Sequence, residues 1–233
     1  MSDKSRRIVA MYLPQYHQIP ENDMFWGNNF TDWVSVKGAI PRFSNHNQPR
    51  IPLDYNYYDL SEHDNIKWQV ELAKKYGIDA FCFYHYWFSS NTNLLTKPTE
   101  IFLKDTSLDI EFCLGWDNAP WKRTWSRQYG NAWTPLYDEK NVQEHSSKEI
   151  LVELNYEDEE GWKKHFDYLL PFFNDKRYIK LGRRPVFLIL NYYRCDILKK
   201  MVSCWNELAK KNGFEGIFFV GRYSGNAYST IFE

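Results

Sequence analysis

The chain has 233 residues, of which 43% are hydrophobic and 25% are charged, and its formal net charge is -1. This composition is ordinary for a globular domain, and the balanced charge gives no electrostatic reason to expect nucleic acid or an anionic membrane as a partner. The aromatic content is high at 18%, with 10 Trp, 17 Tyr and 16 Phe. Many of these rings stand beside polar residues, and such mixtures suit the apolar faces and hydroxyls of sugars. Carbohydrate binding and simple core filling are the two interpretations of this enrichment.

The cysteines and the N-terminal segment indicate where in the cell the protein is expected to be. The sequence has no CxxC pair and no metal-type spacing of cysteine with histidine. Cys82 and Cys113 stand in apolar, strand-like contexts, which predicts buried structural thiols rather than disulfides. The first apolar stretch is too short for a signal peptide, and no apolar run approaches the length of a membrane span. We therefore expect a cytoplasmic protein with no integral membrane segment. The four cysteines are Cys82, Cys113, Cys195 and Cys204.

Apolar and amphipathic segments alternate along the chain, which predicts strands separated by helices. A long polar and aromatic loop from residue 14 to about 58 follows the first strand, and another follows the third. Asp59 or Ser61 is expected to cap the first helix, and Gly182 predicts a hairpin before the fourth strand. The predicted strands are 8–12, 78–87, 110–116, 185–190 and 217–220. The predicted helices contain Ile66, Val70 and Ala73, then residues 94–103, then 159–173, then Ile197, Met201, Trp205 and Leu208.

Two windows of the sequence repeat each other. Residues 71–77 and 207–213 both read Glu-Leu-Ala-Lys-Lys-x-Gly, and each leads directly into a continuous apolar run. Lysines in a last helical turn suit the helix dipole, and a glycine just past the end can adopt the left-handed cap conformation. A continuous apolar strand after such a helix is typical of a parallel strand buried on both faces. The repeat therefore predicts successive strand–helix units.

This alternation predicts an α/β fold, for which two architectures compete. A doubly wound sheet would carry a phosphate-binding GxGxxG turn or a P-loop after an early strand, and the sequence has neither. A (β/α)8 TIM barrel places its long loops at the C-terminal ends of its strands, where the polar and aromatic segments of this chain fall. We therefore predict one domain over residues 1–233, of the TIM-barrel type but incomplete and C-terminally truncated. It would hold about five of the eight strand–helix units and two exposed sheet edges, which favour self-association.

The first strand runs into a group of polar and aromatic residues at positions 12–17. Glu21 and Trp26 follow closely, and prolines at 14 and 20 stiffen the segment. Amide, imidazole and phenol groups gathered at a strand end favour a binding site. The alternative is a structured loop that covers the rim of the barrel.

The second and third strands also end in polar groups. Strand alternation puts His85 and Trp87 on one face of the second strand. His85 is either a ligand contact or a hydrogen-bonded core histidine. Asp117 follows the third strand, where it could bind a sugar hydroxyl, orient Arg123 or act as a general base. The alternative is that Asp117 and Asn118 cap a turn.

Other chemistries lack their motifs. The sequence has no HExxH or HxH pattern for a metal and no GxSxG for a serine nucleophile. Glycoside cleavage usually needs two carboxylates about 5–10 Å apart, and Glu21 and Asp117 are the only acids placed suggestively at strand ends. We predict no metal site and no cofactor, and the catalytic residues stay unknown.

A long series of motifs resembles the WbsX-type glycosyltransferases. These proteins are similar to the glycoside hydrolase 99 (endo-α-mannosidase-like) barrels and are typically encoded with lipopolysaccharide O-antigen and other surface-polysaccharide genes. The resemblance runs from about Arg7 to Val220 and implies a (β/α)8 barrel with a glycan or a sugar nucleotide as its partner. The motifs are residues 10–17, 21–22, 26–27, 30–33, 48–49, 83–88, 116–118, 121–123, 178–180 and 184–187.

The resemblance implies a set of substrate-binding residues but no catalytic pair. The family carries a later Asn-Glu-Trp-x-Glu-Gly segment, whose two glutamates are the acid–base pair in the hydrolase relatives. This sequence has no such segment, because Asn206 and Glu207 follow Trp205 and are themselves followed by Leu208. No catalytic carboxylate is therefore transferred. The substrate-binding residues implied by the resemblance are Tyr12, Gln15, Tyr16, His17, Trp26, His85, Trp87, Trp116 and Asp117.

The resemblance and the strand-end residues together predict a carbohydrate-active protein of O-antigen or lipopolysaccharide biosynthesis that performs glycosyl transfer. Two alternatives stay open. One is an endo-glycosidase-like hydrolase of the α-mannoside type, and the other is a catalytically silent, truncated glycan-binding product.

Overall fold

A computed structural model describes residues 7–41, 43–122, 150–192 and 197–221. The predictions that involve Arg123 and Cys195 lie outside these residues. The chain divides into two compact units. We call residues 1–17, 58–118 and 155–233 the strand–helix unit, and residues 18–57 and 119–154 the insert unit.

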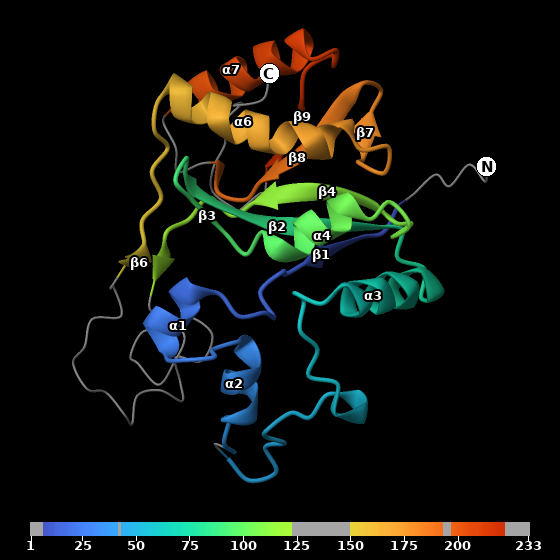
Figure 1. Ribbon diagram of the computed structural model, residues 1–233, viewed down its shortest axis with the longest axis vertical. Coiled ribbons are helices and arrows are strands. Elements are labelled where there is room, and N and C mark those ends of the chain that lie inside the picture. Colours follow the sequence, from blue (N-terminus) through green and yellow to red (C-terminus); the bar gives the residue numbers. More distant parts are fainter. Residues whose placement is uncertain (1–6, 42, 123–149, 193–196, 222–233) are drawn as a thin grey trace. The chain divides into compact units, whose positions relative to one another are not determined.

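The strand–helix unit is built on a parallel sheet whose strands follow one another in chain order (Figure 1). Each new strand joins the sheet beside the strand before it, whereas a doubly wound sheet reverses its strand order at a switch point. The parallel strands, in spatial order, are β1 (Val9–Tyr12), β2 (Ala80–Ser89), β4 (Glu111–Trp116), β8 (Arg184–Ile189) and β9 (Phe218–Gly221).

Four helices cover the same face of this sheet. Ring contacts show the shared face for three of them: Phe83 meets Phe102 of α4, Phe112 meets Phe172 of α6, and Phe187 meets Trp205 of α7. The fourth helix, α3, reaches the same face through Gln69, which accepts a hydrogen bond from Tyr12, the register partner of Phe83. Helices on one face and strands in sequential order are the arrangement of a TIM barrel, so the predicted fold class is confirmed. The described strands do not close into a barrel, since β1 and β9 each pair with one parallel neighbour. The helices are α3 (His63–Lys75), α4 (Lys97–Lys104), α6 (Glu159–Asn174) and α7 (Leu198–Lys211). None of the helices in the described ranges is long and apolar enough to cross a membrane.

The two repeated helix ends have the predicted cap. Gly77 and Gly213 adopt positive φ angles of 81° and 89°. In the first copy, the amide of Ile78 donates to Ala73 O at 2.9 Å and that of Gly77 donates to Lys74 O at 3.2 Å. The second copy repeats both bonds, so each helix ends in a Schellman motif that turns the chain into the next strand.

Other local predictions were wrong. Neither Asp59 nor Ser61 caps α3, because its N-cap is Glu62 and Asp59 Oδ1 instead accepts the Ser61 amide at 2.7 Å. The helix expected from residue 94 begins at Lys97, because β3 (Thr92–Leu94) first returns antiparallel along β2. The predicted hairpin at Gly182 is confirmed and joins β7 (Lys180–Leu181) to β8.

The insert unit contains the segments that we predicted as long loops, and these segments form short helices and strands. Such elements are too short to show a periodic pattern in the sequence. The first part of the unit contains α1 (Pro20–Trp26), α2 (Asp32–Lys37) and a 3-10 helix, η1 (Leu53–Tyr55). Its second part is an antiparallel pair, β5 (Trp121–Lys122) with β6 (Ile150–Val152). Six- and seven-residue helices offer fewer than two full turns, so no amphipathic pattern can build up.

The predicted structural thiols are confirmed for the central strands. Cys82 and Cys113 are buried, free and paired in register between β2 and β4. Cys204 is free and half-buried on α7.

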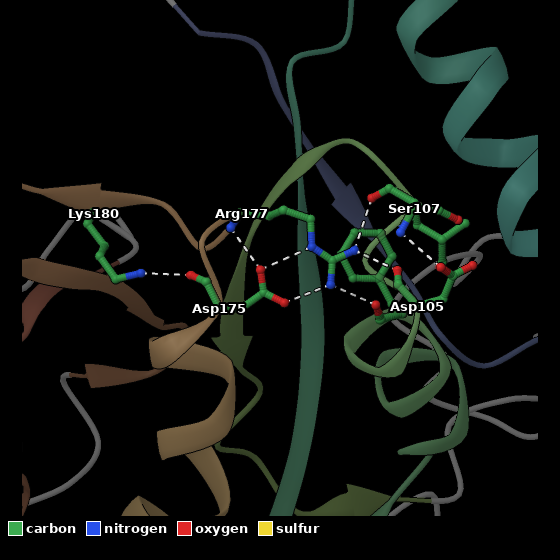
Figure 2. Close-up of polar contacts among 7 residues, drawn as sticks. Asp105, Ser107, Asp175, Arg177 and Lys180 are labelled. Carbon is green, nitrogen blue, oxygen red and sulfur yellow. Dashed lines mark hydrogen bonds and ion pairs between the residues drawn. The ribbon is translucent and has the colours of Figure 1, made fainter.

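Arg177 forms a buried clamp at the N-terminal end of the strands (Figure 2). Its guanidinium holds the Asp175 carboxylate through Nε and Nη2, at 3.0 and 2.7 Å, and both side chains are 5% exposed. The other three N–H groups donate to the carbonyls of Phe102, Asp105 and Leu108, at 2.9 to 3.0 Å. All five donors of the guanidinium are therefore satisfied. The clamp joins the turn after α4 to the turn after α6.

Breaking this clamp should destabilise the fold strongly. Replacing Arg177 with Leu removes the charge partner of the buried Asp175 carboxylate and one donor from each of three carbonyls, and loss of one partner of a buried ion pair costs about 3–5 kcal/mol. Urea denaturation would measure this loss. Lys74→Ala, which removes the exposed ion pair with Asp109, is the control and should change stability little. Equal stability of the two variants would show that the clamp is not a major support of the fold.

Candidate functional site

The C-terminal ends of the parallel strands bring four segments of the strand–helix unit to one edge of the sheet. They are residues 13–17 after β1, 89–91 after β2, 117–118 after β4 and 191–192 after β8. We call this set the strand-end edge. TIM-barrel enzymes bind and convert their substrates at this edge, because the loops that follow the strands converge there.

Asp117 is held at the strand-end edge by its neighbours on β2 and β8. Its amide donates to His85 O at 3.0 Å, and Asn191 Nδ2 reaches its Oδ1 at 3.5 Å. Asn118 and Asn191 bond reciprocally: the Asn191 amide donates to Asn118 Oδ1 at 2.7 Å, and Asn118 Nδ2 donates to Asn191 O at 3.2 Å. Asn118 Nδ2 also donates to the Tyr156 hydroxyl at 2.9 Å. These bonds fix a half-buried carboxylate among amides and a phenol, which is chemistry that can bind hydroxyl groups.

Three of the predicted residues gather on the helix-covered side of the edge, around a second histidine. His85 Nε2 lies 2.8 Å from His165 Nε2, so one ring donates a hydrogen bond to the other. Trp87 stacks on His165 with centroids 4.3 Å apart, and Trp116 presents its edge to the same ring at 5.1 Å. The Trp116 indole also donates to Trp87 O at 2.8 Å. His85, Trp87 and Trp116 are therefore buried together against α6, and contact of a glycan with them stays a prediction.

The two histidines of this cluster are neutral. Burial lowers the pKa of His85 to about 3, and burial together with His85 lowers the pKa of His165 well below its ordinary value. A neutral imidazole has one donor and one acceptor, so two neutral rings can share a single N–H···N bond. Tyr168 stacks on His85 at 5.5 Å and helps to exclude water from the pair.

The predicted residues at the end of β1 and after it differ in how deeply they are buried. Tyr12 lies on the helix-covered face, where its ring packs on Phe83 and its hydroxyl donates to Gln69 of α3. Burial raises the pKa of this hydroxyl above its ordinary value. Gln15 and Tyr16 are half-buried, and the Tyr16 ring meets Tyr58 at 5.4 Å.

His17 ends this group and is buried, with 2% of its surface exposed. Neither ring nitrogen has a hydrogen-bond partner among the described residues. Burial lowers the pKa of His17, although the nearby Asp59 carboxylate acts in the opposite direction.

Trp26 belongs to the insert unit. It ends α1, and its ring lies 5.8 Å from that of Phe30.

Sequence reasoning missed several residues of the strand-end edge. Asn191 directly follows a predicted strand, so the rule that found Asp117 could also have found it. His165 shares the buried face of α6 with Phe166, Leu169 and Phe172, and nothing in its spacing distinguishes it from a core residue. Glu157 has a positive φ of 53° and bonds Ser90 through both carboxylate oxygens, at 2.7 and 2.8 Å. Gly161 makes room for it, because a Cβ there would lie 2.6 Å from the Glu157 side chain.

No group of three or more His, Cys, Asp or Glu side chains within the described part of the chain is arranged to hold a metal ion. The chemistry of the strand-end edge is therefore described by its amides, its phenols, its imidazoles and the carboxylate of Asp117.

Comparison with models of protein families shows the family of this chain. The family model described as Glycosyltransferase WbsX matches residues 8–231. The chain belongs to the WbsX glycosyltransferase family. The WbsX-family chain is also 37% identical, over 209 residues, to a protein described as uncharacterized protein WxcX in two strains of Xanthomonas campestris pv. campestris. These matches cover 88% of this chain and 27% of each relative, so the chain spans about a quarter of the length of the curated relatives it matches.

Solved structures with a similar fold include a GH99 endo-alpha-mannosidase from Bacteroides thetaiotaomicron. Its complex with Bis-Tris propane matches with a TM-score of 0.51 and 10% identity, and covers 92% of this WbsX-family chain and 52% of the mannosidase. A second structure of that enzyme gives a TM-score of 0.51 and 11% identity, over 92% and 54% of the two chains. At such low identity the likeness shows the fold, which agrees with the barrel-type order of the strands.

The buried histidine pair predicts a loss of stability in mild acid. Between pH 6.5 and the folded pKa of about 3 for His85, the unfolded chain binds protons that the folded chain does not, so stability falls as pH falls. At pH 5 the loss is about 2 kcal/mol for His85, and His165 adds to it in the same direction. Urea denaturation at pH 7.5 and 5.0 measures the loss, and His165→Asn should make it smaller.

His63 is a control of opposite sign. Hydrogen bonds to Asp105 and Asp64 raise its pKa, so its stabilising effect is present below pH 6.5 and is lost as pH rises. His63→Asn should therefore make the loss at pH 5 larger. If His165→Asn leaves the difference between the two pH values unchanged, the pair is not held neutral.

Proposed function

We propose that this chain provides a glycan-binding edge in a protein of O-antigen or lipopolysaccharide biosynthesis, and that the protein transfers a glycosyl group. The observation that carries the proposal is the convergence of Asp117, Asn118, Asn191 and Tyr156 at the C-terminal ends of β4 and β8. Membership of the WbsX glycosyltransferase family supports the reaction class. A cytoplasmic location and a sugar-nucleotide donor stay part of this proposal.

Asp117 is the carboxylate best placed to meet an acceptor. In glycosyl transfer an acceptor hydroxyl attacks the anomeric carbon, and a general base takes the proton of that hydroxyl. Asp117 is half-buried and oriented by Asn191, and its position at a strand end favours contact with the ligand. Glu157, by contrast, accepts hydrogen bonds from Ser90 with both of its carboxylate oxygens, and these bonds fix the turn after β2.

We further propose that the predicted residues divide into two roles. Gln15, Tyr16, His17 and Asp117 contact the glycan, whereas the substrate-binding role of Trp26, which belongs to the insert unit, stays a separate prediction. Tyr12, His85, Trp87 and Trp116 are buried beneath the helices and position the ends of β1, β2 and β4.

A hydrolase of the α-mannoside type is the second candidate, favoured by the fold shared with the endo-alpha-mannosidase structures. Retaining or inverting hydrolysis needs a second carboxylate facing the first across the bond. The engagement of Glu157 with Ser90 makes transfer or glycan binding the better supported function for the described residues.

Asp117→Asn tests the proposal. The change keeps the shape of the side chain but removes the base, so transfer should fall about 10²- to 10⁴-fold while the fold survives. The assay measures the transfer of a sugar from each of a panel of nucleotide sugars to oligosaccharide acceptors. In parallel it measures the cleavage of aryl α-mannosides. Glu111→Gln, at the opposite end of the same strand, is the matched control and should leave the rate unchanged. Equal activity of the two variants would remove Asp117 from the reaction, and cleavage of mannosides without transfer would favour the hydrolase.

Self-association through an open sheet edge is a separate proposal. β1 pairs on one side with β2, and the exposed apolar residues on or beside it are Ile8, Val9, Met11 and Leu13. Such an edge can pair with another chain. Met11→Lys should therefore reduce concentration-dependent association in sedimentation velocity, whereas Leu72→Lys on the exposed part of α3 should not. A wild-type protein that stays monomeric at high concentration would contradict this proposal.

A further inference from the structure

Residues 33–53 of the insert unit combine exposed apolar side chains with positive charge. We call them the basic apolar segment. No described residue of the segment is buried, and its large aliphatic and aromatic side chains include several that are more than half exposed to solvent. Proteins rarely gather such side chains on their surface without a partner that covers them. The residues that are more than half exposed are Val34, Ile40, Phe43, Ile51 and Leu53.

The contacts of α2 explain why the segment presents its apolar side chains outward. Trp33 meets the Tyr57 ring edge-on at 5.2 Å, and Lys37 Nζ lies 4.1 Å from the centre of the same ring. Residues four apart share one side of a helix, so this side of α2 packs on Tyr57 and Val34 is left on another side. Between residues 41 and 52, three prolines restrict the backbone. The apolar side chains therefore project from a restricted backbone rather than from a packed core.

The charge of the basic apolar segment has one sign. The segment contains Lys37, Arg42 and Arg50 and no Asp or Glu, whereas the whole chain has a formal net charge of -1. The balanced charge of the whole chain therefore conceals a local excess of positive charge. In the sequence, Arg42 and Arg50 directly precede Phe43 and Ile51, so each of these cations stands next to an exposed apolar residue.

We propose that the basic apolar segment binds the surface of a membrane that contains anionic lipid. Apolar side chains can insert at the boundary between head groups and acyl chains, and basic residues near the surface attract anionic head groups. Nucleic acid would satisfy the cations but leave the aliphatic side chains exposed, and the core of a protein interface is depleted in charged residues. A membrane surface suits both features of the segment, because its head groups are charged and its acyl chains are apolar.

This inference is independent of the proposed glycan-binding function. The basic apolar segment contains none of the residues for which we propose contact with a glycan, and its tests use no sugar. Failure of the membrane proposal would therefore leave the proposed role of the strand-end edge unchanged.

Cosedimentation with lipid vesicles tests the role of the apolar side chains. The full chain should bind vesicles of phosphatidylglycerol and phosphatidylcholine in equal parts, and should bind vesicles of phosphatidylcholine alone much more weakly. The double variant Ile51→Ser/Leu53→Ser should bind the anionic vesicles at least about tenfold more weakly, because it removes two exposed side chains that would insert. Tyr76→Ser is the matched control. It changes a residue that is 71% exposed just past the end of α3 and should bind like the wild type.

Arg50→Gln tests the role of the charge. This variant should bind the anionic vesicles about fivefold more weakly, which is the usual contribution of one basic residue near an anionic surface. Lys75→Gln makes the same change of net charge on α3 and should have little effect. Raising the ionic strength from about 0.1 M to about 1 M should also weaken binding of the wild type, because it shortens the Debye length from about 10 Å to about 3 Å. The substituted side chains are exposed, so the circular dichroism spectra of all variants should match that of the wild type.

Three outcomes would overturn the proposal. They are a wild type that binds neither kind of vesicle, a wild type that binds both kinds equally, and a double variant that binds the anionic vesicles as tightly as the wild type. A second copy of the chain would be the better occupant if the wild type bound no vesicles and the double variant lost concentration-dependent association in sedimentation velocity.

Discussion

Burial of one aromatic face of the sheet under α3, α4, α6 and α7 determines where every strand-end residue lies. Side chains alternate along a strand, so packing Phe83 against α4 also commits His85 and Trp87 to the helix side. The same alternation puts Trp116 under α6 and α7 and places Gly115 on the other face, where a Cβ would meet Cys82 Sγ at 3.0 Å. The polar side chains that can contact a ligand are therefore those that do not pack against the helices.

The sheet has two chemically different ends. At the N-terminal end, Arg177 satisfies all five of its donors with Asp175 and three carbonyls, and no polar capacity of this side chain is left for a ligand. At the C-terminal end, Asn191 orients Asp117, and neither ring nitrogen of His17 has a partner among the described residues. Saturated polar groups stabilise a fold, whereas unsaturated ones cost stability and persist where binding compensates for them. In barrel folds generally, the N-terminal face serves stability and the C-terminal face carries function, and the contrast seen here has the same direction.

Local patterns in the sequence predicted the fold well because its determinants are local. The apolar runs that became β2 and β4, and the glycines at positions 77 and 213, act within a few residues of where they stand. Asp59 failed as a cap for a similarly local reason, since it bonds the Ser61 amide before the helix begins. The candidate site was harder to predict, because His85 meets a histidine 80 residues away and Asn118 meets an asparagine 73 residues away. Sequence motifs describe residues that are close together in the chain, so they cannot predict contacts between residues this far apart in sequence. The rule that looks for polar residues at strand ends could therefore find Asp117 but not the side chains that bond to it.

Burial alone does not separate a structural histidine from a functional one. His17, His85 and His165 are all buried, and burial lowers the pKa of each, so composition and titration give them the same character. The difference lies in their partners. His85 and His165 satisfy one another inside an aromatic cluster, and the pair ties α6 to the end of β2. His17 carries the same desolvation without a bond, so the free energy that holds it in place must come from the packing around it. His17 also lies at the strand-end edge, where barrel folds bind their substrates, so its position and its lack of a partner among the described residues, not its burial, distinguish it from the structural pair.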